Sequence, residues 1–202
     1  PANGTSFGEV VSPTKPGYTA DKAKVEAVNN VTGDTADIVE TVVYSPETQK
    51  LTYTVIDDTT NTTLEDKKDL ASGDSNSDVK PETQTTYDNI VASYEAKGYE
   101  LVRKDALPTK FDTDTTVDQN VTIHLKHKTE VTQESKKVKH TINYVYKDNN
   151  PAEPAFPTVE RELEFTRENT KDLVTNVVTN GQWTPANGTS FGEVVSPTKP
   201  GY

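Results

Sequence analysis

The first eighteen residues of the chain occur again, without a change, as its last eighteen. Residues 1–18 read PANGTSFGEVVSPTKPGY, and residues 185–202 read the same, 184 positions later. Chance does not produce an identity of this length, so the chain contains a little more than one period of a tandem repeat. A period of 184 residues is large enough for one or two domains with cores of their own. The repeat therefore predicts domains in series, an arrangement that adds reach and lets weak contacts act together.

We expect the sequence to begin and to end inside a module. We expect residues 1–46 to close one module, residues 47–133 to form a complete second module, and residues 134–202 to open the next copy of the first. Ile38–Tyr44 is apolar on both faces, as a central strand is. We expect it to lie parallel to Thr141–Tyr146, either in another molecule or, if the linkers near Pro46 and Glu134–Lys137 fold back, within one chain.

Composition excludes several kinds of site. The chain has no cysteine and a formal net charge of −11. Without cysteine it forms no disulfide, thiolate nucleophile or zinc–cysteine site. The acidic balance argues against nucleic acid and anionic membranes as partners, because both demand clustered lysine and arginine. No stretch approaches the roughly 18 apolar residues of a membrane-spanning helix, so we expect no membrane insertion.

Low apolar content raises the question of disorder. Hydrophobic residues make up 31% of the chain and charged residues 26%, a balance that approaches that of disordered proteins. Against disorder, the chain has nine Tyr and five Phe, and its apolar residues recur at every second position. This spacing is typical of half-exposed strands. We expect small, thin β-rich domains with modest cores.

Residues 50–128 show the pattern of two strands, a helix and two further strands. Apolar residues alternate along residues 51–56 and again at Val121, Ile123 and Leu125, while residues 62–70 are predicted to form a returning strand and residues 71–80 a loop. Helical spacing follows, and the residues that carry it are Tyr87, Ile90, Val91 and Tyr94. The order β-β-α-β-β is that of a ubiquitin-like β-grasp, in which one helix covers one face of a mixed sheet.

Two signals suggest where this helix begins and ends. Thr85, with Asp88 three residues later, resembles a capping box, which predicts a helix start at this point. Gly98 stands where a left-handed residue commonly ends a helix. The sequence from Tyr99 onward then predicts a third strand.

The other part of the period reads as all-β. Alternation is strong from Val138 to Tyr146 and again from Val159 to Phe165, and residues 172–183 are predicted to form a third strand. The predicted fold class is therefore a β-rich α+β fold of two β-grasp-related modules arranged end to end, one with a helix and one nearly all-β.

Short motifs in both parts carry a family resemblance. They are YTVIDD at 53–58, GY at 98–99, FDTD at 111–114, DQ at 118–119 and HLKH at 124–127, together with HTINY at 140–144, EFTR at 164–167, WTP at 183–185 and PGY at 200–202. The pattern resembles the mucus-binding repeats (MucBP and Mub type) of cell-wall-anchored adhesins from gut lactic-acid bacteria. The resemblance implies display on the bacterial cell surface, neighbouring repeats of the same protein, and binding to host mucin glycoproteins or other secreted glycoproteins, immunoglobulin among them.

Asp112, Asp114 and Asp118 are the candidate metal ligands. The D-x-D start resembles a calcium-binding EF-hand loop, but the turn glycine and the terminal bidentate glutamate are missing. The alternative is a polar loop in which aspartates cap a turn, and this alternative is preferred. We therefore predict no metal and no cofactor, with calcium at these three aspartates as the open alternative.

Histidine chemistry is not indicated. His124 and His127 lie three apart on a predicted strand and therefore face opposite sides, which prevents them from chelating one ion. His140 stands alone, and no serine has a G-x-S-x-G setting. The chain is not predicted to be an enzyme.

Trp183 is the weak candidate for ligand binding. An aromatic face can stack on a pyranose ring, but a tryptophan at a strand end also packs partly into a core. Two functions remain open: a module that binds host mucus glycoproteins, and a structural spacer with no ligand of its own.

Overall fold

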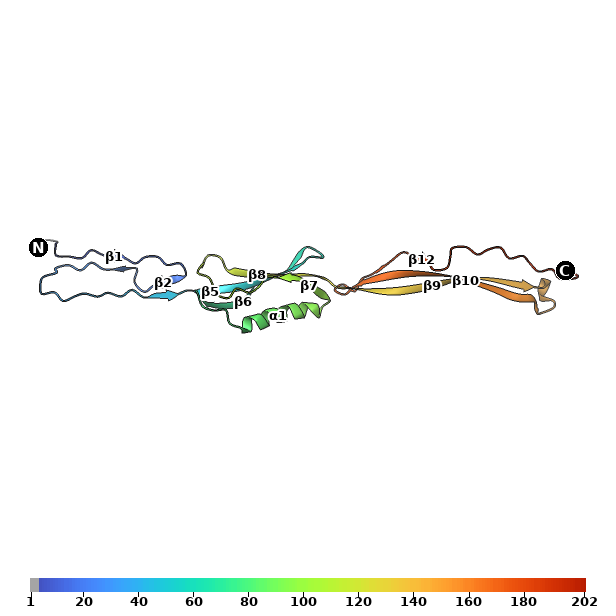
Figure 1. Cartoon of the computed structure of the whole chain (residues 1–202), viewed down its shortest axis with the longest axis horizontal. Coiled ribbons are helices and arrows are strands. Elements are labelled where there is room, and N and C mark those ends of the chain that lie inside the picture. The colour runs from blue at the N-terminus through green and yellow to red at the C-terminus, as the bar shows by residue number, and fades with distance from the viewer. Residues whose placement is uncertain (1–3) are drawn as a thin grey trace. The chain divides into compact units, whose positions relative to one another are not determined.

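The computed structural model describes residues 4–202, which divide into two compact units, the first ending at residue 127 and the second covering residues 128–202. The described part of the chain is β-rich, with one α-helix and several separate sheets (Figure 1). Within it, no helix has the length and apolar character needed to cross a membrane. The first unit contains β1 Val10–Val11, β2 Tyr18–Ala20, β3 Lys24–Val25, β4 Tyr44–Pro46, β5 Thr48–Asp57, β6 Thr62–Asp74, α1 Glu82–Glu95, β7 Tyr99–Lys104 and β8 Gln119–His127. The second contains β9 Thr129–Val145, the short 3-10 helix η1 Lys147–Asn149, β10 Pro154–Asp172, β11 Val178–Asn180 and β12 Thr184–Pro185.

Residues 49–127 form a four-stranded sheet with one helix. The strand order is β6-β5-β8-β7, and the central pair β5–β8 is parallel while the outer pairs are antiparallel. A parallel pair needs a long connection, and here the connection contains β6, α1 and β7. The predicted order of elements is confirmed for this part, while its assignment as a β-grasp remains a prediction.

The core of this part lies between the central strands and α1. Leu51, Val55, Ile123 and Leu125 are completely buried, and Tyr87 of α1 is 1% exposed. Burying one such aliphatic side chain contributes about 1.5–3 kcal/mol. Both the alternation along β8 and the helical spacing along α1 are confirmed, because their apolar positions are the ones that face this core.

The ends of two elements differ from the prediction. The helix begins at Glu82 after Pro81, so Thr85 and Asp88 lie inside it and form no capping box. Proline fixes φ near the helical value, which makes a helix start there favourable. Strand β6 continues to Asp74, through part of the predicted loop, because its pairing with β5 extends to Thr48. Gly98 does adopt the left-handed conformation (φ 95°) at the end of the helix.

Residues 4–48 form two small antiparallel pairs, β1–β3 and β2–β4. Residues 38–43 belong to no strand and are mostly exposed, with Val39 88% exposed. The prediction that Ile38–Tyr44 is a buried central strand is therefore wrong for this single chain, and residues 141–145 of β9 pair with β10 instead. Among the described residues, no sheet covers both faces of residues 38–43.

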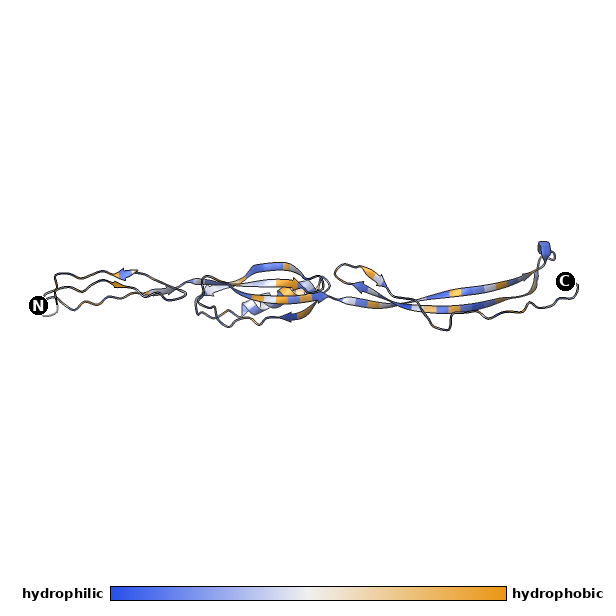
Figure 2. Ribbon diagram, turned by 90° about the horizontal axis from the view of Figure 1, so that it is seen from above, coloured by the Kyte–Doolittle hydropathy of each residue, from blue (hydrophilic) through white to orange (hydrophobic). Residues whose placement is uncertain are grey.

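The second unit is built on one long antiparallel hairpin. Strand β9 pairs with β10 from Val145↔Pro154 to Thr129↔Asp172, and β11 and β12 pair with the other edge of β10. Apolar and polar residues alternate along both long strands (Figure 2). Burial is sparse, since Leu163 and Tyr146 are both 8% exposed while most of this unit is more open.

Two expectations for this unit need correction. Residues 134–137 lie inside β9 and are no linker, because their backbone pairs continuously with residues 164–167 of β10. The predicted strand at residues 172–183 is broken by a turn, and only Val178–Asn180 pairs with β10. In that turn the Asp172 carboxylate accepts hydrogen bonds from the N–H groups of Val174 and Thr175, which is the local bonding by which aspartate favours turns.

Candidate ligand-binding surfaces

Trp183 lies on the surface of the second unit, immediately before β12. Because Thr184 pairs with Thr166, the ring lies beside Arg167 of β10, whose guanidinium carbon is 4.3 Å from the ring centroid. Cation–π contacts of this kind contribute about 0.5–1 kcal/mol at exposed sites. The tryptophan remains 36% exposed, so it is neither a buried core residue nor a fully open one.

A polar cluster holds Arg167 in place under the ring. Its Nε donates to Oε2 of Glu134 at 2.7 Å, and the side-chain amide of Asn169 donates to the same oxygen at 2.7 Å. These two hydrogen bonds, Arg167 first, hold the pKa of the Glu134 carboxyl below its usual value. The carboxylate is therefore ionised at neutral pH. The surface combines an aromatic face, a fixed cation and an anion, which are the kinds of groups that orient a polar ligand, while the Asn169 side chain is buried beneath them.

The aspartate loop after Phe111 caps its own turn. Asp112 accepts a hydrogen bond from the N–H of Asp114 at 3.3 Å, and Asp114 accepts from both the N–H (2.9 Å) and the hydroxyl (2.5 Å) of Thr116. The bonds from Thr116 lower the pKa of Asp114. Asp118 lies four residues further along, and in the described part of the chain no group of three acidic or histidine ligands converges. These contacts support the interpretation as a turn.

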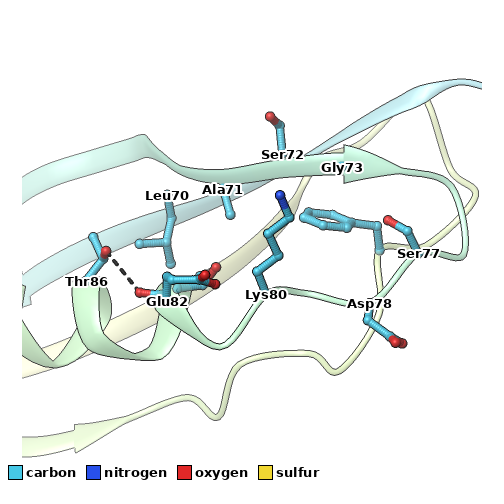
Figure 3. Close-up of a pocket in the computed structure, with 11 residues that line it drawn as sticks. Leu70, Ala71, Ser72, Gly73, Ser77, Asp78, Lys80, Glu82 and Thr86 are labelled. Atoms are coloured by element: carbon cyan, nitrogen blue, oxygen red, sulfur yellow. Dashed lines mark hydrogen bonds between the residues drawn. The ribbon is translucent and has the colours of Figure 1, made fainter.

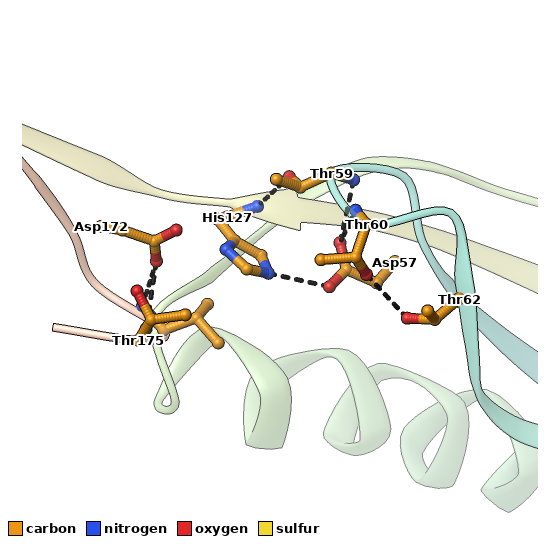
Figure 4. A network of polar contacts seen from close by, with 8 residues as sticks. Asp57, Thr59, Thr60, Thr62, His127, Asp172 and Thr175 are labelled. Carbon is orange, nitrogen blue, oxygen red and sulfur yellow. Dashed lines mark hydrogen bonds and ion pairs between the residues drawn. The ribbon is translucent and has the colours of Figure 1, made fainter. Parts of the chain in front are cut away.

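The histidines contact different aspartates. Nδ1 of His124 is 2.8 Å from Oδ1 of Asp58, while Nε2 of His127 is 2.8 Å from Oδ2 of Asp57. Figure 4 shows the contacts around Asp57, whose other oxygen accepts the N–H of Thr59 at 2.9 Å. The Thr59 hydroxyl in turn accepts the backbone N–H of His127. These bonds tie the β5–β6 turn to the end of β8, which is a structural role.

His140 also has a structural contact. Its Nδ1 lies 2.6 Å from a terminal nitrogen of Arg161, and its ring centroid is 5.2 Å from that of Phe191. Pairing of β9 with β10 places Arg161 directly opposite His140, so the neighbours of this histidine are a guanidinium and an aromatic ring.

A groove beside the start of α1 was not predicted. It has a volume of about 440 Å³ and lies between β6 and the helix, with Leu70, Ala71 and Phe111 on its apolar side (Figure 3). Polar side chains surround it, and those that line it are Ser72, Ser77, Asp78, Lys80, Glu82, Thr83 and Thr86. The Phe111 ring is 3% exposed and offers no open stacking face. No local motif marks this groove, since it depends on β6 continuing past residue 70 and on the return of the chain at Phe111.

Comparisons with known proteins match both parts of the chain. The family model described as a Muc B2-like domain matches residues 1–48 and 129–202, and the model described as a mucin binding domain matches residues 49–127. Among solved structures, the chain is similar to "Crystal structure of Mub-RV", with 30% identity and a TM-score of 0.60, over 76% of this chain and 84% of that one.

A second solved structure is described as the type 2 repeat of the mucus binding protein MUB from Lactobacillus reuteri. Its identity to this chain is 28% with a TM-score of 0.46, over 76% of this chain and 84% of that one. A search of the curated proteins finds no match.

Proposed function

Because the chain belongs to the Muc B2-like and mucin binding domain families, we propose that it is a repeat unit of a bacterial surface adhesin that binds host mucus glycoproteins. One observation carries the proposal: the mucin binding domain model spans residues 49–127, the whole of the helix-containing part with its closed core. Similarity to Mub-RV over most of both chains supports it. Mucin glycans are the proposed ligands, and immunoglobulin is a second glycoprotein of the same class.

Trp183 is the proposed point of contact with a sugar. Arg167 covers one side of the ring, and the exposed remainder offers an apolar surface for the C–H face of a pyranose. Glu134, which accepts hydrogen bonds from Arg167 and from the buried Asn169, places a carboxylate close to the stacking surface. Hydroxyl groups of the sugar would hydrogen-bond to such a group, so the cluster supplies both the apolar and the polar parts of a glycan site.

Retention on immobilised mucin tests the function. A single solvent-exposed site is expected to bind weakly. The chain is therefore compared as a monomer and as a tethered tandem dimer, in which avidity raises retention. Retention of wild type that free mucin oligosaccharides release supports the proposal. If neither form is retained on mucin or on immunoglobulin, the chain is a spacer that projects other regions.

The site is tested separately with Trp183→Ala. Losing an aromatic contact of about 0.5–1.5 kcal/mol predicts binding that is weaker by roughly two- to tenfold. Tyr202→Ala is the matched control, because it removes another exposed aromatic ring, 80% exposed, away from Trp183. Since Trp183 is the only tryptophan, its fluorescence reports directly on whether a sugar reaches it. Retention on mucin with unchanged fluorescence keeps the function and rejects this site.

A further inference from the structure

Residues 4–48 form an apolar groove that is open to solvent. Its volume is about 480 Å³, and the apolar residues that line it are Phe7, Val10, Val25, Val28, Val31 and Ile38. Phe7 is 62% exposed, Val10 63% and Ile38 45%. Glu26, Asp37 and Glu40 also line it and give it an acidic rim. Contiguous exposed apolar surface with a polar rim is typical of an interaction site.

The repeated segment shows what can cover this groove. Phe191, which occupies the same place in residues 185–202 as Phe7 does in residues 1–18, is half-buried in the second unit. It lies against His140 and against Arg161, whose guanidinium carbon is 5.3 Å from the ring centroid. Val194, the equivalent of Val10, is 37% exposed instead of 63%. The β9–β10 hairpin thus covers Phe191 and part of Val194 more than residues 4–48 cover Phe7 and Val10, whereas Val195 stays at least as open as Val11.

The two copies of the segment use different atoms for their contacts. In residues 4–18, backbone groups pair with the residues that follow them: Phe7 exchanges two hydrogen bonds with Val28, and Ser12 donates to Ala23. In residues 185–202, the contacts go to β10 instead, and the carbonyl of Gly192 accepts a hydrogen bond from Arg161.

Further contacts of residues 185–202 also go to β10. Ala186 donates to the carbonyl of Glu164, and the Lys199 amine donates to the carbonyl of Ala155. Gly8 and Lys15, the equivalents of Gly192 and Lys199, are not among the groups by which residues 4–18 contact residues 23–28. Ala2, the equivalent of Ala186, lies outside the described residues. One copy of the segment can therefore satisfy both neighbours at once, with β10 on one edge and residues 23–28 on the other.

We infer that the groove of residues 4–48 is the docking surface for the β9–β10 hairpin of a second copy of this chain. In the complex, one repeated segment lies between β10 of one molecule and residues 23–28 of the other. A single domain family matches both residues 1–48 and residues 129–202, as two parts of one domain would. Arg161 then lies over the groove, where the carboxylates of its rim complement its charge.

The free energy that favours docking comes from covering the groove and not from contacts of the repeated segment. Docking exchanges one identical segment for the other, so the hydrogen bonds already made by the two segments largely cancel. What is added is cover for Val25, Val28, Val31 and Ile38, which lie partly open in the single chain. In addition, Nε of Arg161 is buried without a partner among the described residues, and an acidic rim offers it an acceptor. Each molecule has one groove and one hairpin, so the contact either closes reciprocally or continues head to tail.

Sedimentation velocity of the full 202-residue chain tests the inference. We expect the average mass to rise from one chain toward two or more as concentration increases over roughly 1 µM to 1 mM. Ile38→Glu places a charge in the groove and should keep the chain monomeric over the same range. Ile38 belongs to no strand, so the change should leave far-ultraviolet circular dichroism unaltered.

The matched control is Val39→Glu. It introduces the same charge one residue later, at a side chain that is 88% exposed and does not line the groove, so it should associate as wild type does. A wild-type chain that stays monomeric at every concentration overturns the inference, and so does association that both variants weaken equally. Association that Ile38→Glu does not reduce would mean that another surface is used, which also overturns it.

Discussion

Replacing Asp57 by alanine removes a buried carboxylate that joins two strand ends. Asp57 is 2% exposed, and its hydrogen bonds to His127 (2.8 Å) and to the N–H of Thr59 (2.9 Å) are both short. A hydrogen bond to a charged group contributes about 1.5–3 kcal/mol. With two such bonds lost, we expect Asp57→Ala to lower the free energy of unfolding of the first unit by about 3–6 kcal/mol. Asp57→Asn keeps an acceptor for Thr59 and should lose roughly half of this.

Two spectroscopic signals separate the units in a urea titration. Helix α1, the one α-helix of the described residues, lies in the first unit, and Trp183, the single tryptophan, lies in the second. Far-ultraviolet circular dichroism therefore follows the first unit, and tryptophan fluorescence follows the second. We expect Asp57→Ala to move the circular dichroism transition to lower urea and to leave the fluorescence transition in place, at a chain concentration low enough to prevent association.

The pH dependence gives this prediction a second check. Burial alone would raise the pKa of Asp57, but hydrogen bonds from His127, Thr60 and Thr59 outweigh it and lower the pKa. A carboxyl with a lowered folded pKa stabilises the fold above its unfolded pKa of about 3.9, and that stability is lost as the pH falls through the folded pKa. The gap between wild type and Asp57→Ala should therefore narrow below about pH 4. A gap under about 1 kcal/mol at neutral pH, or a gap unchanged at low pH, would refute the reasoning.

Two further substitutions test packing and a buried hydroxyl in the same unit. Gly73→Ala places a Cβ that overlaps the buried Phe111 ring, and should lower the free energy of unfolding by about 1–3 kcal/mol in urea denaturation. Gly33→Ala, which meets no atom within 4 Å, is the control, and equal losses would contradict the packing argument. Tyr87→Phe removes the hydroxyl that donates to the Asp105 carbonyl at 2.9 Å, at a cost of about 1 kcal/mol. Burial and nearby acidic groups raise the pKa of Tyr87 to about 12. Wild type should therefore lose stability as the pH rises above about 10, and a Tyr87→Phe variant with the same alkaline loss would show that this tyrosine is not its source.

Elements with a complete local pattern and a nearby core were predictable from the sequence. The alternation at Val121, Ile123 and Leu125 gave β8, and the spacing from Tyr87 to Tyr94 gave α1, because both elements bury one regular face in the same core. The end of β6 was not predictable, since residues 71–74 are held by cross-strand pairing with β5 and not by their own polar sequence. Local pattern therefore located the elements, while their ends depended on partners distant in the sequence.

The candidate surfaces depended even more on distant partners. Trp183 was visible as an aromatic residue near a strand, but its contact with Arg167 follows from the register of β12 on β10, which sequence spacing does not give. The same is true of Glu134, which was assigned to a linker and instead holds Arg167 from the neighbouring strand. The aspartate loop, in contrast, was predictable from local sequence. Its bonds run between residues two apart, so sequence was sufficient to favour a turn.

The repeated segment separates what sequence decides locally from what its neighbours decide. Both copies form the same turn, in which Tyr18 donates to the carbonyl of Lys15 at 3.1 Å and Tyr202 donates to that of Lys199 at 3.1 Å. The glycine before each tyrosine has the left-handed conformation, with φ of 79° and 82°, which glycine adopts without strain.

Upstream of this turn the two copies differ. Val10–Val11 forms strand β1 against β3, whereas the identical residues 194–195 form no strand. A strand needs a partner to satisfy its backbone groups, and in the described part of the chain Val10–Val11 has one in β3 while residues 194–195 have none. The repeated segment thus specifies its turn by local sequence alone. It forms a strand only where a neighbouring segment pairs with it, so the structure upstream of the turn depends on the neighbour.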